Sequence, residues 1–155
     1  MTSAAVAAAD AANRIPVAAR IRRVLVANRG EIALRVVRAA RAIGLETVVV
    51  TSDADRDQLA AQLADRAVCI GGASAATSYL NIDAVLAAAV GTGSAAVQPA
   101  YGFLSANPEF ARRCEEEGRI FIGPCPRSVA ATGDTAAARD IAANAGVPIL
   151  TGSSI

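Results

Sequence analysis

Four consecutive residues, Asn28-Arg29-Gly30-Glu31, stand where an apolar run gives way to a helical pattern. A polar turn between a parallel strand and the N-terminus of a helix is where α/β proteins build nucleotide and phosphate sites, because free backbone N–H groups point at the ligand there. The turn has one glycine and lacks the GxGxxG spacing that wraps a pyrophosphate. It is either a ligand loop or a tight turn that needs Gly30, and the residues alone favour the tight turn.

A second candidate is the segment 98–107, QPAYGFLSAN, which follows a later apolar run. It gathers Tyr101, Phe103 and Leu104 beside Gly102 in a chain whose aromatic content is only 3%. Loops that concentrate such side chains often form the wall of a binding site. The same side chains could instead plug the end of a sheet, and both interpretations stay open.

A third candidate is Gly133-Asp134-Thr135, which precedes a helical pattern. It could let a phosphate approach the helix N-terminus, or Asp134 could cap the helix while Gly133 permits the turn. Because no lysine stands here, the capping role is favoured.

Composition excludes several kinds of chemistry. The 15 basic residues are all arginine, and the chain has neither lysine nor histidine. A Schiff-base lysine, a phosphate-binding lysine, an imidazole acid or base and a histidine zinc site are therefore unavailable. The cysteines Cys69, Cys114 and Cys125 have no CxxC spacing, so we expect free thiols in a reducing cytoplasm.

Charge and hydropathy limit the kinds of partner that the sequence predicts. A formal net charge of +1 gives no electrostatic reason to expect nucleic acid or an anionic membrane, and no run of about 20 apolar residues predicts a membrane span. Residues 1–20 are alanine-rich. They read as a disordered tail or a transit peptide, and Asp10 counts against the transit peptide.

Strand and helix patterns alternate along the rest of the chain. The spacing predicts strands at 24–28, 47–51, 67–70, 95–97 and 120–122, and helices at 31–43, 58–64, 82–90, 107–117, 127–132 and 135–145. Such alternation predicts an α/β fold with an open parallel sheet and flanking helices. A last apolar run, 147–150, reads as one more strand.

The first helix has two notable faces. Its expected buried stripe consists of Ile32, Val36, Ala39, Ala40 and Ile43. The basic residues Arg35, Arg38 and Arg41 recur at every third position and form either a solvated face or a subunit contact.

Several segments together resemble the N-terminal domain of biotin carboxylase, the component of acyl-CoA and pyruvate carboxylases. The matching segments are 24–50 (VLVANRGEIALRVVRAARAIGLETVVV), 52–57 (SDADRD), 63–65 (LAD), 67–71 (AVCIG), 78–82 (SYLNI), 102–107 (GFLSAN) and 121–126 (FIGPCP). The resemblance covers about residues 22–152. It implies a Rossmann-like pre-ATP-grasp domain at 21–132, after the tail at 1–20, and the truncated start of an ATP-grasp region at 133–155.

The resemblance also implies a reaction. The family carboxylates biotin on a carrier protein, using ATP, Mg²⁺ and bicarbonate, mainly within an ATP-grasp domain and a C-terminal domain. The chain ends just after it would enter the ATP-grasp region, so we expect it to be inactive on its own. We also expect the remainder of that region to be absent and 147–150 to be mobile or misplaced.

Some residues carry over and others depart from the family pattern. Asn28, Arg29, Gly30 and Glu31 carry over, as do Tyr101, Gly102 and Asn107 in the loop near biotin. Gln98 replaces a histidine, Ala100 a glycine and Ala106 a glutamate. Thr135 stands where the family has a lysine for the ATP phosphates. If the replaced glycine has a positive φ, Ala100 strains the turn.

Three functions are compatible with these residues. The chain could be a biotin carboxylase N-terminal domain, alone or as one piece of a split enzyme. It could be a non-catalytic module, or a truncated remnant, that pairs with a carboxylase subunit or dimerises through the first helix. In that case Arg35 and Arg38 would match the family's contact, although Ala42 replaces an acidic residue. It could also be an independent nucleotide binder, which the missing lysine disfavours.

Overall fold

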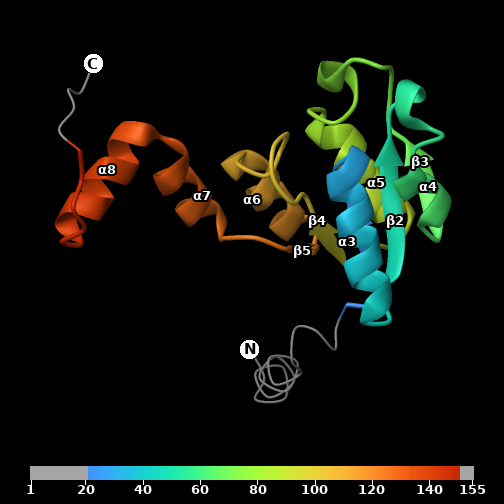
Figure 1. Cartoon of the computed structure of the whole chain (residues 1–155), viewed down its shortest axis with the longest axis horizontal. Coiled ribbons are helices and arrows are strands. Elements are labelled where there is room, and N and C mark those ends of the chain that lie inside the picture. The colour runs from blue at the N-terminus through green and yellow to red at the C-terminus, as the bar shows by residue number, and fades with distance from the viewer. Residues whose placement is uncertain (1–20, 151–155) are drawn as a thin grey trace, which may run out of the picture.

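The computed structural model describes residues 21–150, so the predicted tail at 1–20 lies outside the described residues. A parallel sheet of five strands has the order β3-β2-β1-β4-β5 (Figure 1). The strands are β1 Arg23–Val26, β2 Glu46–Thr51, β3 Arg66–Cys69, β4 Ala96–Gln98 and β5 Ile120–Phe121. The α-helices are α3 Gly30–Ala42, α4 Leu59–Leu63, α5 Ile82–Gly91, α6 Pro108–Glu116, α7 Pro126–Gly133 and α8 Thr135–Asn144.

The central strand β1 organises the sheet. Val24, Leu25 and Val26 are all buried, since helices or neighbouring side chains cover both faces of the strand. In register, Val24 pairs with Thr47 of β2 on one side and Ala96 of β4 on the other. This arrangement confirms the predicted α/β fold with an open parallel sheet.

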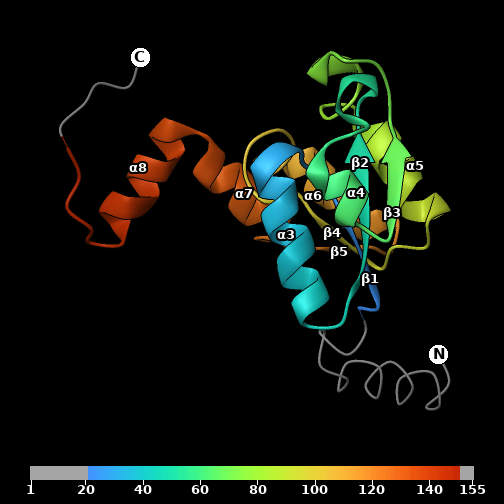
Figure 2. The same cartoon turned by 45° about the vertical axis from the view of Figure 1, so that its right-hand side comes forward.

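Two helical layers cover the sheet (Figure 2). Alternate residues of a strand point to opposite faces. Leu25 accordingly joins the large core cluster beneath α5 and α6, which contains Phe110 and Val85. Val26 joins the cluster of α3 and α4, with Val37 and Ala60.

The predicted helix signals are largely confirmed. The side chain of Asn81 accepts a hydrogen bond from the backbone N–H of Ala84 at 3.1 Å and caps α5. Asn107 caps α6 in the same way through Phe110 at 3.1 Å, and Asp134 caps α8. Gly44, just after α3, has a φ of +78°, as a glycine that ends a helix often does.

The predicted buried stripe of α3 is wrong by about one residue. The residues of α3 that are buried are Ala33, Val37 and Ala40. These small or β-branched side chains let the helix approach β1 and β2 closely. Of the stripe expected from the sequence, only Ala40 is buried, and Ile43 is 74% exposed. The rest faces an open part of the sheet surface.

The last predicted strand is also wrong, since residues 147–150 form no strand. A strand needs a neighbour for its backbone, and no described strand lies beside this segment. The Val147 N–H bonds to the carbonyl of Ala142 at the end of α8, and Leu150 is 90% exposed. Helices α7 and α8 project from the sheet as an arm (Figures 1 and 2). None of the helices in the described residues is long and apolar enough to cross a lipid bilayer.

Candidate functional site

The loops after β1 and β4 meet at the carboxyl edge of the sheet. The chain leaves β1 toward β2 on one side, while β4 pairs on the other, so the two strands flank the point where the strand order reverses. Open α/β sheets place ligands in the crevice at such a point. Both segments singled out from the sequence, the turn at 28–31 and the loop at 98–107, lie here.

The side chain of Asn28 joins these two segments. It is 4% exposed, and its Nδ2 donates hydrogen bonds to the carbonyls of Pro99 and Tyr101, each at 2.8 Å. Its Oδ1 accepts from the backbone N–H of Arg29 at 2.8 Å. Both amide hydrogens and the amide oxygen are therefore used, so the buried polar group is satisfied and ties the loop after β4 to the end of β1.

Arg29 lies over two aromatic rings. Its guanidinium carbon is 5.4 Å from the ring centroids of both Tyr79 and Phe103, which stack on each other at 5.0 Å. The guanidinium also pairs with Asp55, Nη1 to Oδ2 at 3.5 Å. Arg29 thus joins the turn after β1 to the residues that follow β2, to Tyr79 and to the loop after β4.

Asp55 collects hydrogen bonds on one oxygen. Its Oδ2 accepts from the hydroxyl of Ser52 at 2.6 Å and from the hydroxyl of Tyr79 at 2.9 Å. Burial alone would raise the pKa of Asp55, but these hydrogen bonds and the charge of Arg29 outweigh it and lower the pKa. The carboxylate is thereby held ionised.

Tyr79 is 1% exposed and uses both sides of its hydroxyl, since the oxygen also accepts the buried N–H of Ser52 at 3.0 Å. Burial, with the nearby carboxylate of Asp55, raises the pKa of Tyr79 to about 12. The phenol is therefore neutral and serves as a hydrogen-bond donor, not as a base.

The segment 28–31 at the start of α3 forms a tight turn, which the sequence favoured over a ligand loop. Gly30 has a φ of +60°, which suits glycine, and its N–H donates to Oε1 of Gln58 at 2.7 Å. This N–H is one of the groups that a phosphate would need. It is already engaged within the chain.

In the loop at 98–107, some side chains plug the end of the sheet, and another stays open as the wall of a binding site would be. Leu104 is 2% exposed and Phe103 is half-buried, so these side chains close the end of the sheet. Tyr101 is 64% exposed and leaves its ring available to a partner. Asn107 caps α6, and Gly102 supplies a φ of +73° for the turn.

Two residues other than glycine have positive φ angles in this loop. Ala100 has a φ of +57° and Phe103 a φ of +45°. The left-handed region is costly for residues with a Cβ atom, so this loop stores strain. The N–H of Ala100 donates to Oε1 of Gln98 at 2.8 Å, which supports the strained residue. The strain expected at Ala100 is thus present.

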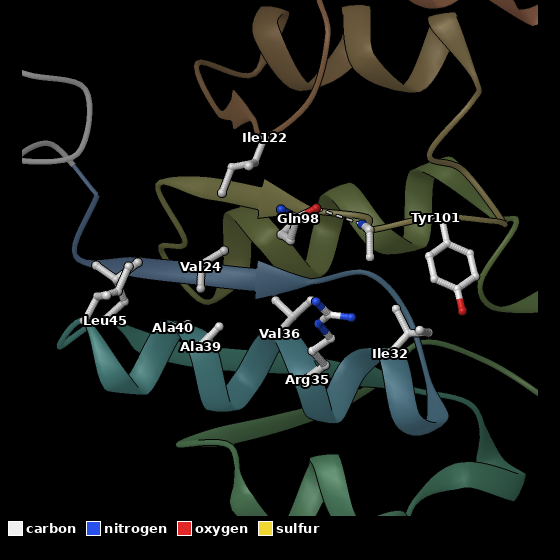
Figure 3. A pocket seen from close by; sticks show the side chains of 12 residues that line it. Val24, Ile32, Arg35, Val36, Ala39, Ala40, Leu45, Gln98, Tyr101 and Ile122 are labelled. Carbon is white, nitrogen blue, oxygen red and sulfur yellow. Dashed lines mark hydrogen bonds between the residues drawn. The ribbon is translucent and has the colours of Figure 1, made fainter.

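A groove of about 560 Å³ lies between α3 and the strands β1 and β4 (Figure 3). Its α3 wall is formed by Ile32, Val36 and Ala39, and Tyr101 stands at one end. Arg35 is the one charged residue among those that line it. The other predicted contact residue, Arg38, is exposed on α3 outside the groove, and Thr135 begins α8 in the projecting arm (Figure 1).

Sequence reasoning did not select Ser52, Asp55 or Tyr79 as site residues, although they complete the network around Arg29. They occur in the SDADRD and SYLNI segments, which carried the family resemblance. The network has one arginine, one carboxylate and one neutral phenol: Asp55 pairs with Arg29 and accepts the hydroxyl of Tyr79, and Arg29 lies over the Tyr79 ring. It contains no base placed to activate a nucleophile, and no cluster of three or more metal-binding side chains occurs among residues 21–150.

Comparison with known proteins gives a consistent match. The model of the family "Biotin carboxylase, N-terminal domain" matches residues 20–129. Biotin carboxylase of Allochromatium vinosum is 52% identical over 135 residues, which is 87% of this chain and 30% of that protein. The mitochondrial methylcrotonoyl-CoA carboxylase subunit alpha of Glycine max is 49% identical over 133 residues, 86% of this chain and 18% of that protein.

Comparison with solved structures gives matches to proteins of the same family. The biotin carboxylase subunit of pyruvate carboxylase superposes with a TM-score of 0.81 at 41% identity, over 86% of this chain and 29% of that chain. The biotin carboxylase domain dimer of 2-oxoglutarate carboxylase from Hydrogenobacter thermophilus, in complex with MgADP, ADP and bicarbonate, gives a TM-score of 0.82 at 41% identity over 86% and 29%. The chain thus spans less than a third of the length of these proteins and matches their N-terminal part.

The hydroxyl of Tyr79 can be tested by Tyr79→Phe. The change keeps the ring stack but leaves the buried N–H of Ser52 without an acceptor and removes a donor to Asp55. We expect the free energy of unfolding in urea to fall by about 1–3 kcal/mol. Tyr101→Phe, at the exposed tyrosine, is the matched control and leaves it within about 0.5 kcal/mol. Equal effects of the two changes would contradict this role of Tyr79.

The strain at Ala100 can be tested by Ala100→Gly. Glycine relieves the positive φ but adds freedom to the unfolded chain, and we expect a net gain of about 0.5–1 kcal/mol in unfolding free energy. Ala106→Gly, in the same loop at a residue without a positive φ, should lower it by about 0.4–1 kcal/mol. A loss of stability in both variants would show that Ala100 is unstrained.

Proposed function

Because the chain belongs to the family of biotin carboxylase N-terminal domains, we propose that it acts as the first domain of a biotin carboxylase unit. That unit would belong to an acyl-CoA or pyruvate carboxylase and carboxylate biotin on a carrier protein at the expense of ATP. The observation that carries the proposal is the family match over 20–129, together with a fold that superposes on biotin carboxylase domains.

The described residues do not fit ATP and Mg²⁺. Asp134 caps the N-terminus of α8 by accepting the Ala137 N–H at 2.8 Å. The adjacent Thr135 carries no positive charge. No metal-binding cluster occurs in the described part of the chain. ATP-dependent chemistry therefore needs residues that this domain does not supply, and we expect the chain alone to show no bicarbonate-dependent ATP cleavage.

The domain's own contribution is the position of a loop. Asn28 and Arg29 hold the segment after β4, and they leave Tyr101 exposed at the carboxyl edge. We assign Tyr101 and Gly102 to the side of the site that faces biotin. Asn107 acts there indirectly, by capping α6 and ending the loop.

A chimeric enzyme tests the proposal. Residues 21–155 replace the matching segment of the Allochromatium vinosum biotin carboxylase, and biotin-dependent ADP release is measured. We expect a folded chimera with lower activity than the parent. Thr135→Lys should raise its kcat/KM about tenfold or more, because a charged hydrogen bond to phosphate is worth about 1.5–3 kcal/mol.

Thr132→Lys, at an exposed threonine on the neighbouring helix α7, is the matched control and leaves activity unchanged. A folded chimera that is inactive both with Thr135 and with Thr135→Lys would contradict the proposed role of the domain.

A second candidate function is that of an interaction module. Arg35 and Arg38 are exposed on α3, and neither forms a hydrogen bond or ion pair with any residue that the structure describes. Free guanidinium groups on one helix face suit an acidic surface of another subunit. If the chain pairs through this face, Arg38→Glu weakens its capture by a carboxylase subunit in a pull-down, whereas Arg127→Glu on α7 does not.

A further inference from the structure

We propose that Gln98 is a positioning residue for Tyr101. Its side-chain amide holds Ala100, the residue before the tyrosine, in a conformation that alanine rarely adopts. The role given to Tyr101, on the side of the site that faces biotin, rests on the proposed function. The hold of Gln98 on Ala100 is a property of this chain alone and can be measured without any activity.

Gln98 lies at the last position of β4, where the chain enters the loop. Its backbone carbonyl accepts the N–H of Ala27 at 2.9 Å, which fixes the end of the strand beside the end of β1. Its side chain reaches two residues forward, and Oε1 accepts the N–H of Ala100 at 2.8 Å (Figure 3). Pro99, between them, is buried and has a φ that its ring locks. A short and stiff segment therefore connects the end of the strand to the residue that Gln98 holds.

Ala100 depends on this hydrogen bond. Its φ of +57° lies in the left-handed region, which is costly for a residue with a Cβ atom. The net gain from one hydrogen bond is of similar size, so the bond to Gln98 offsets much of the strain. Asn28 binds only carbonyls of this loop, and within residues 21–150 the N–H of Ala100 has no acceptor other than Gln98. Without that acceptor, residue 100 can relax to a negative φ, and the chain after it changes direction.

A second strained residue follows Tyr101. Phe103 has a φ of +45°, and its ring stacks on Tyr79 at 5.0 Å between centroids. The guanidinium carbon of Arg29 is 5.4 Å from the centroid of the Phe103 ring. Strained residues persist only where their surroundings hold them. Tyr101 thus lies between two such residues, each held by a side-chain contact.

The ring of Tyr101 depends on the backbone for its position. It is 64% exposed, so little packing against the rest of the chain fixes it. A change of φ at Ala100 therefore moves the ring. A side chain that is already in place loses less conformational freedom when it binds. By holding Ala100, Gln98 prepares Tyr101 for binding, and loss of the hold should weaken binding at this loop.

Hydrogen exchange in the full 155-residue chain tests the hold of Gln98 on the loop. The N–H of Ser105 donates to the carbonyl of Gly102 at 3.0 Å, so its exchange rate reports whether the loop keeps its turn. Gln98→Met removes the acceptor at similar side-chain length, and we expect the Ser105 amide to exchange about fivefold faster. Gln98→Glu keeps an oxygen acceptor and is the matched control, with exchange within about twofold of the parent rate. Protected amides in β1 and β2 show that both variants fold.

Relief of the strain should compensate for the lost hydrogen bond. Ala100→Gly, added to Gln98→Met, should return Ser105 exchange to within about twofold of the parent rate, since glycine adopts the left-handed conformation at little cost. Ala106→Gly, added to the same variant at a residue without a positive φ, should give no recovery. Three outcomes would overturn the proposal: unchanged Ser105 exchange in Gln98→Met, equal acceleration in Gln98→Glu, or no recovery with Ala100→Gly.

The chimeric enzyme with Thr135→Lys tests the consequence for biotin. Gln98→Met should raise KM for biotin about fivefold and leave KM for ATP unchanged, because only the loop that carries Tyr101 is released. Ala100→Gly, added to it, should restore KM for biotin. An unchanged KM for biotin despite faster Ser105 exchange would overturn the positioning role. A chimera inactive in every form would contradict the proposed function and with it the role of Tyr101, while the exchange rates still decide whether Gln98 holds the loop.

Discussion

A buried amide at the end of the central strand is the interaction on which the rest of the site depends. In a parallel sheet, the loops that follow β1 and β4 emerge at the same edge, and the backbone pairing of the two strands ends at the hydrogen bond from the Ala27 N–H to the carbonyl of Gln98 at 2.9 Å. Beyond that bond, Asn28 connects the two loops with two donated hydrogen bonds and one accepted bond, all at 2.8 Å. Burying the Asn28 amide without hydrogen-bond partners would cost free energy. The segment after β4 therefore stays where its carbonyls accept these hydrogen bonds.

The hydrogen bonds of Asn28 explain how the carboxyl edge of the sheet supports the loop after β4. Arg29, Asp55 and Tyr79 interact with one another, and Arg29 also lies over the ring of Phe103, so these contacts tie together four segments far apart in the chain. Tyr101 is left exposed as a result, at the end of a groove that α3 leaves open. The helix approaches the sheet through Ala33, Val37 and Ala40, and this close approach turns its larger apolar side chains toward the groove.

Much of the fold was predictable because its signals are local. Alternating apolar runs, the caps Asn81 and Asn107 and the glycine after α3 each depend on neighbours in the chain. The buried stripe of α3 was misassigned because helical periodicity does not say which of two adjacent faces meets the sheet. The strand expected at 147–150 failed because a strand requires a partner from elsewhere. Tyr79 was missed as a site residue because its contacts with Ser52 and Asp55 span 27 and 24 residues.

The central claim is that the buried amide of Asn28 holds the loop that presents Tyr101. Asn28→Asp tests it most directly, because the carboxylate keeps the acceptor for Arg29 but loses both donors to Pro99 and Tyr101. Asn107→Asp is the matched control, since aspartate caps a helix as well as asparagine does. Amide hydrogen exchange over the loop should accelerate at least tenfold in Asn28→Asp while β1 and β2 stay protected, and remain unchanged in Asn107→Asp. Unchanged exchange in the loop of Asn28→Asp would contradict the account.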